Sequence, residues 1–284
     1  MTAANPPRDE SPLDLSSTAH LMNSIGSRLA GQLRLVSLDG RRRPRPPALV
    51  LVAHGSRDPR ALRTVRALAD RVSTLRPALP VRLGHIELDE PRLPDTLARL
   101  GNTPAVLVPL LLSRGHHVKR DIPEMVAASG VPARVAPPLG PHPLLVETLY
   151  DRLVEAGWPA GADEATLRTH AVVLAAAGSR DPDSAADTRR TARLLATRLG
   201  VPVIPAYASA AEPTVRGALR QLAARGRHRV AVASCFTAPG RFSTECAKAA
   251  PWIASAPLGT HEAMTHLILH RYDQVCATPV TAVA

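Results

Sequence analysis

Residues 51–60 read LVAHGSRDPR, and residues 174–183 read LAAAGSRDPD. In each copy a short apolar run enters a glycine-containing turn, and the polar stretch that follows has helical periodicity, which predicts a strand, a loop and a helix. The shared GSRDP predicts a tight connection with its aspartate, Asp58 in the first copy, near the start of the helix. Because this unit is written twice, the sequence predicts two similar domains. The copies differ at one telling position, since His54 of the first is Ala177 in the second.

Further apolar runs follow each copy, separated by polar segments of helical periodicity. They predict four strands in each half, at residues 48–53, 81–87, 105–112 and 131–137, and at residues 171–176, 201–207, 229–236 and 252–257. Strands that alternate with helices are typical of parallel sheets covered on both faces. We therefore expect an α/β fold of two similar four-stranded parallel-sheet domains, residues 48–157 and 170–276, with a cleft between them.

Composition narrows the class of protein. The 284 residues are 45% apolar without a run long enough to span a membrane, and the first residues lack a secretory pattern, which predicts a soluble protein of the cytoplasm. The formal charge of +11 comes with only 2% aromatic residues and with arginine spread over both halves, which favours a small acidic ligand over nucleic acid. Residues 1–47, rich in proline and arginine, predict a flexible tail and linker, with a short amphipathic helix from Leu21 to Leu33.

Three polar side chains follow predicted strands of the first half. His54 comes directly after the first strand, Glu87 ends the second, and His117 lies in the loop RGHHVKRD after the third. Because the carboxyl ends of parallel strands share one edge of a sheet, we expect these side chains to meet. Two imidazoles and a carboxylate can bind a divalent transition metal or accept protons near neutral pH. The sequence leaves open whether His116 or His117 faces this edge.

The second half lacks these groups. Ala177, Ser209 and Phe242 stand where the first half has its two histidines and its glutamate. We interpret the first half as the carrier of the reactive groups and the second as an opposing wall. The chain has no GxGxxG, P-loop or GxSxG motif, so neither nucleotide binding nor a serine nucleophile has a motif in its favour.

With these residues in view, LVAHGSRDPR, GHIELDEP and PLLLSRGHHVKRDIP together resemble the class II chelatases of the sirohydrochlorin group, the family of long CbiX and SirB. The family signature pairs a histidine in HGS with a GxHxxxDIP run. Here His117 takes the histidine position of that run, Asp121 takes its acidic position, and Glu87 matches the family's carboxylate. The resemblance covers about residues 48–275 and implies two small parallel sheets with the tetrapyrrole in the cleft between them.

The resemblance also implies the reaction, which is the insertion of Fe2+ or Co2+ into sirohydrochlorin by a lyase that needs neither ATP nor a permanently bound metal. His54 and His117 would take the metal transiently, and Glu87 would assist as a proton acceptor. The carboxylates of sirohydrochlorin would pair with basic side chains at the same edge, which are Arg57, Arg114, Lys119 and Arg120.

Several readings stay open at this point. We favour the iron enzyme of sirohaem biosynthesis over the cobaltochelatase of cobalamin biosynthesis, although imidazole and carboxylate ligands suit both ions. A non-catalytic carrier of tetrapyrrole or metal is an alternative, as is a hydrolase that keeps a metal in the histidine and glutamate cluster. We expect a monomer or a homodimer that acts on sirohydrochlorin and a divalent metal ion, with neither a nucleic acid nor a membrane as partner.

Overall fold

The computed structural model of the chain describes residues 45–161 and 163–278. The expected helix at residues 21–33 and the rest of the expected tail, apart from residues 45–47, lie outside these ranges. The strands are β1 (Ala48–Ala53), β2 (Val81–His85), β3 (Ala105–Pro109), β4 (Ala133–Val135), β5 (His170–Ala176), β6 (Val203–Tyr207) and β7 (Arg229–Ser234). The helices are α2 (Pro59–Leu75), α3 (Leu93–Ala98), α4 (Ile122–Ser129), α5 (Pro143–Glu155), α6 (Glu164–Leu167), α7 (Pro182–Leu199), α8 (Val215–Ala223), α9 (Arg241–Lys248) and α10 (Glu262–Ala277), with a π-helix, η1, at His117–Asp121. Within the described ranges, no helix has both the length and the apolarity that a membrane span needs.

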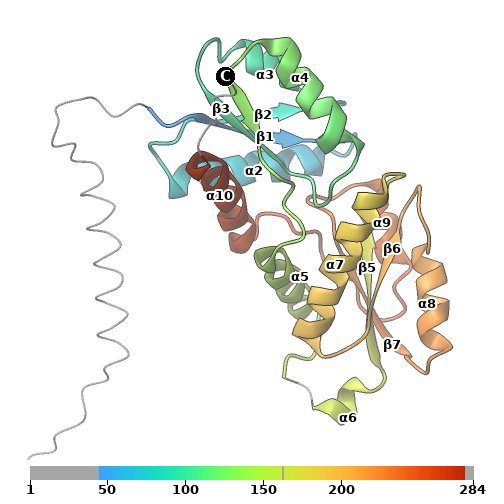
Figure 1. Cartoon of the computed structure of the whole chain (residues 1–284). Coiled ribbons are helices and arrows are strands. Elements are labelled where there is room, and N and C mark those ends of the chain that lie inside the picture. The colour runs from blue at the N-terminus through green and yellow to red at the C-terminus, as the bar shows by residue number, and fades with distance from the viewer. Residues whose placement is uncertain (1–44, 162, 279–284) are drawn as a thin grey trace, which may run out of the picture. The chain divides into compact units, whose positions relative to one another are not determined.

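The strands form two parallel sheets, as predicted (Figure 1). The first sheet has the order β2-β1-β3-β4 and the second the order β6-β5-β7. The prediction of a fourth strand in the second half is wrong, because residues 252–257 make only a single bridge, between Val232 and Ala254. Pro251 precedes that segment and Pro257 ends it, and the ring of Trp252 packs against the rings of Trp158 and His170, so the backbone does not continue along β7.

The two halves agree in their backbone geometry at the GSRDP turn. Gly55 has φ +99° and Gly178 has φ +91°, a region that residues with a Cβ atom rarely adopt. A Cβ atom at these positions would lie 1.7 Å from the carbonyl oxygen of Glu87 and 1.9 Å from that of Ser209. Both copies therefore need glycine, and the match confirms that Glu87 and Ser209 are equivalent positions.

Helices cover both faces of each sheet. In the first half, α2 packs on the face that carries Leu49 and Leu51, while α3 and α4 pack on the opposite face. In the second half, α7 covers one face of β5, and α8 and α9 cover the other. The alternation of faces along β1 and β5 follows from the two-residue period of a strand, and both strands are buried throughout.

The last helix of each half packs on the other half. Helix α5 contacts α7 and β7, and α10 contacts α2 and β3 (Figure 1). Arg271 of α10 donates a hydrogen bond to the carbonyl oxygen of Leu139, and Arg152 of α5 donates one to that of Leu258. Buried residues of both halves consequently belong to one continuous apolar core.

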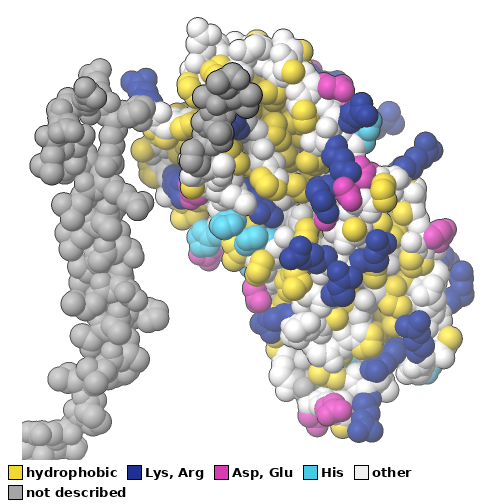
Figure 2. Space-filling view, in the orientation of Figure 1, with side chains coloured by type: hydrophobic (Ala, Val, Ile, Leu, Met, Phe, Trp, Pro, Cys, Tyr) yellow, Lys and Arg dark blue, Asp and Glu magenta, His cyan; other side chains and the backbone are white. Residues whose placement is uncertain are grey.

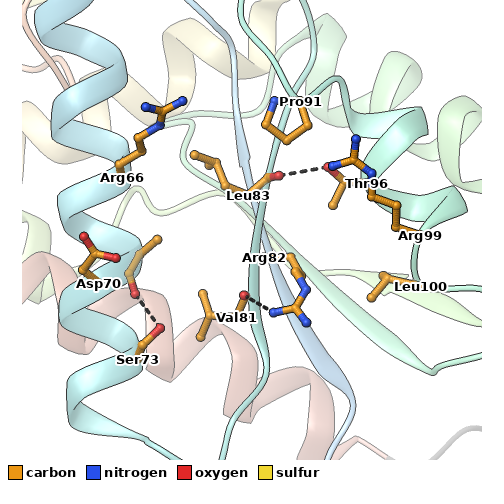
Figure 3. A pocket seen from close by; sticks show the side chains of 11 residues that line it. Arg66, Asp70, Ser73, Val81, Arg82, Leu83, Pro91, Thr96, Arg99 and Leu100 are labelled. Carbon is orange, nitrogen blue, oxygen red and sulfur yellow. Dashed lines mark hydrogen bonds between the residues drawn. The ribbon is translucent and has the colours of Figure 1, made fainter.

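The outer edge of β2 is closed by side chains rather than by another strand. Arg82 donates to the carbonyl oxygen of Val81 and Thr96 to that of Leu83, each at 2.9 Å (Figure 3). Arg66 and Arg99 line a cavity of about 470 Å³ at this edge, one on either side of β2 (Figure 3). Charged side chains and occupied carbonyl groups of this kind protect an edge strand from pairing with another chain. The cavity contains none of the site residues that the sequence predicts.

Candidate metal-binding site

The structure brings His54, Glu87 and His117 together at the carboxyl ends of the strands of the first sheet. One potential ligand atom from each residue lies within 4.8 Å of the others. His54 follows β1, Glu87 follows β2, and His117 opens η1 after β3. The predicted convergence of the three side chains is therefore present, and a single ion could contact all three.

His54 has an acceptor beside each ring nitrogen. Its Nδ1 lies 3.1 Å from the carbonyl oxygen of Gly55, and its Nε2 lies 3.0 Å from Oε1 of Glu87. The side chains of His54 and Glu87 are 42% and 49% exposed, so an incoming ion can reach them. If the proton of a neutral ring is on Nδ1, the lone pair of Nε2 faces the carboxylate. A proton or a cation between the two groups removes the resulting repulsion.

His117 is oriented by a carboxylate. Its Nδ1 forms a short hydrogen bond with Asp121, one turn later in η1. The ring of His117 lies edge-on to that of His54, with a centroid distance of 4.8 Å and an interplanar angle of 80°. A carboxylate on Nδ1 fixes the tautomer of a ligating histidine and leaves Nε2 for the metal. The π-helix, a feature often found at functional sites, places both side chains.

The structure also decides between the two adjacent histidines. The side chain of His116 is 72% exposed, and its Nε2 lies 3.3 Å from the second carboxylate oxygen of Asp121. Only His117 packs against the ring of His54. Of the two, His117 belongs to the cluster of possible ligands, and His116 is a solvent-exposed partner of Asp121.

Other histidines have structural contacts. His142 and His261, from the matching PLGPH and PLGTH loops, cap α5 and α10 by accepting a backbone N–H through Nδ1. Burial, with the nearby Arg271 and His270, lowers the pKa of His142 to about 4. His85 is fully buried, and its Nδ1 lies 3.1 Å from the carbonyl oxygen of Pro91.

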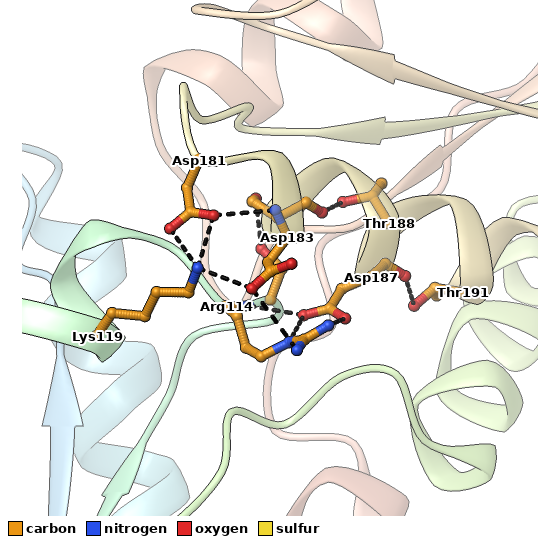
Figure 4. A network of polar contacts seen from close by, with 9 residues as sticks. Arg114, Lys119, Asp181, Asp183, Asp187, Thr188 and Thr191 are labelled. Atoms are coloured by element: carbon orange, nitrogen blue, oxygen red, sulfur yellow. Dashed lines mark hydrogen bonds and ion pairs between the residues drawn. The ribbon is translucent and has the colours of Figure 1, made fainter.

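The four basic residues expected to bind substrate divide into two pairs. Arg57 and Arg120 are exposed, and neither forms an ion pair with any residue in the described ranges. Arg114 and Lys119 instead contact carboxylates at the start of α7 in the second half (Figure 4). On the face drawn in Figure 2, Lys and Arg side chains are scattered over both halves with acidic side chains among them.

The carboxylates of α7 are functional candidates that the sequence reasoning missed. Asp181, Asp183 and Asp187 lie in the second copy of GSRDP and in the helix after it. The sequence does contain a sign of them, since the second copy has Asp183 and Asp187 where the first has Arg60 and Thr64. It points to no partner by itself, since the partner loop lies far away in the sequence.

The fold is that of a chelatase. The structure of SirB from Bacillus subtilis with Fe3+ matches with a TM-score of 0.67 at 24% identity, covering 82% of this chain and 96% of that one. In sequence, the chain is 31% identical over 185 residues to the sirohydrochlorin ferrochelatase of Bacillus subtilis (strain 168), covering 62% of this chain and 68% of that protein. It is 32% identical over 137 residues to the sirohydrochlorin cobaltochelatase of Methanopyrus kandleri, covering 38% of this chain and 96% of that protein.

The family model of CbiX matches residues 48–156 and again residues 171–275. The chain therefore belongs to the CbiX family, and its two halves are two copies of the family's unit. This confirms the resemblance that the three sequence motifs predict.

Proposed function

We propose that this protein is a sirohydrochlorin chelatase that inserts a divalent metal, Fe2+ in the first place, into sirohydrochlorin without ATP. The observation that carries the proposal is the cluster of His54, Glu87 and His117, whose ligand atoms lie within 4.8 Å of one another. Its relatives include a sirohydrochlorin ferrochelatase and sirohydrochlorin cobaltochelatases. Residues 48–157 would hold the reactive groups and residues 170–276 the opposing wall, with the tetrapyrrole in the predicted cleft between them.

The two imidazoles deliver the metal ion, which is a substrate. Neutral imidazole is a ligand for Fe2+ and Co2+, and an ion bound between His54 and Glu87 takes the place that a proton could otherwise occupy. Both side chains of that pair are partly exposed, so the ion can arrive from solvent and leave toward the macrocycle. The orientation of His117 by Asp121 keeps its Nε2 aimed at the same point.

Glu87 acts as the proton acceptor. Two protons leave the pyrrole nitrogens as the metal enters, and a carboxylate in hydrogen-bond reach of the site can take one from the macrocycle and pass it to solvent. Glu87 is suited to this transfer because about half of its side chain is exposed, at 49%. The second proton follows by the same route after Glu87 has released the first to solvent, or is taken by Nε2 of His54 once the metal has left it.

Arg57 and Arg120 supply charge for the carboxylates of the substrate. Both lie within a few residues of a site histidine, and both guanidinium groups are free of ion pairs within residues 45–161 and 163–278. Guanidinium groups bind carboxylates with two parallel hydrogen bonds, which orients the ligand. Arg114 and Lys119 keep this role only if the substrate displaces the carboxylates of α7.

Cobalt is the second candidate metal. The Methanopyrus kandleri relative is named a cobaltochelatase, and the ligand set of two imidazoles and a carboxylate accepts either ion. The protein would then serve cobalamin biosynthesis instead of sirohaem formation.

We place it in the cytoplasm, as a monomer or a homodimer.

The test is an anaerobic absorbance assay with sirohydrochlorin and Fe2+, Co2+ or Ni2+ in parallel. We expect the spectrum of the metallated macrocycle to appear at an enzyme-dependent rate, fastest with Fe2+. Binding of sirohydrochlorin without insertion of any of the three metals would indicate a carrier. Metal that survives dialysis in stoichiometric amount would indicate a hydrolase with a resident ion.

A further inference from the structure

The second half has lost the reactive residues but contacts the segment that carries His117. We infer that the start of α7 positions that segment, with Asp181, Asp183 and Asp187 as positioning residues for the site on the other half. The inference rests on the proposed function for its effect on turnover, but the position of His117 can be measured without it.

Asp187 holds Arg114 through both the main chain and the side chain. Its Oδ2 accepts hydrogen bonds at 2.9 Å from the backbone N–H and from Nε of Arg114, and its Oδ1 accepts one at 2.7 Å from Nη2. Asp187 is only 4% exposed. Burial would raise the pKa of its carboxyl, but the bonds from Arg114 outweigh burial and the pKa lies below its usual value. The paired carboxylate and guanidinium thus fix the loop three residues before His117.

A second set of contacts fixes the segment beyond His117. Nζ of Lys119 lies 2.8 Å from a carboxylate oxygen of Asp181 and 2.8 Å from one of Asp183 (Figure 4). At Gly115, a Cβ atom would lie 3.5 Å from Oγ of Ser179, so the two halves approach closely there. His117 is therefore held on both sides, at residues 114–115 and at residue 119, by the second half.

The reciprocal contact carries no such charges. The equivalent loop of the second half also approaches the first copy of GSRDP, and a Cβ atom at Gly240 would lie 3.8 Å from Oγ of Ser56. However, Pro239 and Thr244 stand where the first half has Arg114 and Lys119, and Arg60 pairs with Asp58 in its own loop. The ion pairs thus serve only the half that carries the histidines.

Ion pairs that only hold the two halves together need not lie beside His117. At its far end, α7 forms another ion pair with the first half, between Arg198 and Glu147, with Nε 3.1 Å from Oε1. That pair contacts α5, away from the His117 segment, and gives a matched control. Removing a charge there disturbs the same two halves and the same helix without touching the segment that bears the histidine.

The test compares Asp187→Asn, Arg114→Gln and their double variant with Glu147→Gln. We expect the Asp187 and Arg114 variants to lower kcat about 10- to 100-fold, the usual loss when a partner that orients a metal ligand is removed, with KM for sirohydrochlorin nearly unchanged. The double variant should lose no more than the worse single variant, because both remove one interaction. Glu147→Gln should keep the activity of the natural protein.

The NMR resonances of the His117 ring in metal-free protein give a readout independent of insertion, assigned by comparison with His117→Ala. We expect Asp187→Asn to shift them and Glu147→Gln to leave them in place. Unshifted resonances would overturn the inference even if insertion is established, and shifted resonances would support it even if insertion fails.

Two further outcomes are decisive. A rise in KM for Arg114→Gln but not for Asp187→Asn would overturn the inference, because Arg114 would then bind the substrate itself. If the buried Asp187 or its partner cannot be replaced without unfolding, the more exposed pair of Lys119 and Asp183 is tested with Lys119→Gln and Asp183→Asn. Activity equal to that of Glu147→Gln in both would also overturn it.

Discussion

Nε2 of His54 and Oε1 of Glu87 lie 3.0 Å apart, at the point where β1 and β2 end. An imidazole nitrogen and a carboxylate oxygen at this distance need a proton or a metal ion between them. Exchange of one for the other couples metal uptake to proton release, and the reverse exchange, departure of the metal with uptake of a proton, is the one that insertion into a macrocycle requires.

Loss of either imidazole should abolish insertion. His54→Ala and His117→Ala are expected to lower kcat by more than about 100-fold, because removing only the outer partners of a metal ligand already costs 10- to 100-fold. Both side chains are partly exposed, so thermal melting should change little. Ala177→His, the reverse change in the second half, should add no activity. Turnover retained in both histidine variants would contradict the site.

Glu87→Gln separates proton transfer from metal binding. The amide keeps the size of the side chain but cannot accept the proton, so kcat should fall about 10²- to 10⁴-fold, the usual contribution of a positioned acid or base. Binding of Co2+, followed by its visible absorbance, should weaken much less because both imidazoles remain. An equal loss in turnover and in Co2+ affinity would assign Glu87 to the metal alone.

Removing the free guanidinium groups should affect substrate binding. Arg57→Gln and Arg120→Gln are each expected to raise KM for sirohydrochlorin about two- to fivefold, since an exposed ion pair contributes about 0.5–1 kcal/mol. We expect kcat to stay constant, which distinguishes this effect from the loss of a metal ligand. Arg82→Gln, on the outer edge of β2, removes the same charge outside the site and should leave KM unchanged. A similar rise in all three variants would mean that only net charge matters.

The continuous core predicts that the halves unfold together. Leu267 of α10 is fully buried among residues of both halves, and Leu267→Ala should lower the free energy of unfolding by about 2–5 kcal/mol. Leu222→Ala, buried in the second half alone, should cost a similar amount. Calorimetry should show a single transition for each variant. Two separated transitions would contradict the coupling of the halves.

Acid should destabilise the fold partly through His142. Its pKa in the folded state is about 4, below the ordinary value of 6.5, so between these pH values the unfolded chain binds more protons and the free energy of unfolding falls as the pH drops. His142→Asn keeps a capping side chain for α5 but removes the titrating ring. When the pH is lowered from 6.5 to 4, the melting temperature of the variant should fall less than that of the natural protein. Thr214→Asn exchanges a capping side chain of α8 that does not titrate, and this control should keep the acid sensitivity of the natural protein.

The convergence of His54, Glu87 and His117 could be predicted because topology alone enforces it. Parallel strands bring their carboxyl ends to one edge, whatever lies between them in the sequence. The fourth strand of the second half could not be excluded in the same way. An apolar run predicts burial, and residues 252–257 are buried in part by ring packing instead of by a ladder of hydrogen bonds.

The ion pairs and the placement of the last helices were beyond the sequence for a related reason. The apolar face of α5 or α10 looks the same whichever sheet it covers. A charge such as that of Arg114 does not reveal whether its partner is a substrate or another part of the chain. Both questions depend on how the two halves meet, which no local pattern records.

Because α5 and α10 each pack on the opposite half, neither half is complete without the other. If the chain were cleaved in the connection at residues 157–169, the two fragments should stay associated, because the last helix of each packs on an apolar surface of the other. Deletion of either half would expose the apolar surface that its last helix covers on the other half. The second half is therefore needed for the stability of the first, even though it lacks the two histidines and the glutamate. Its surface positions away from the shared core are under no such constraint.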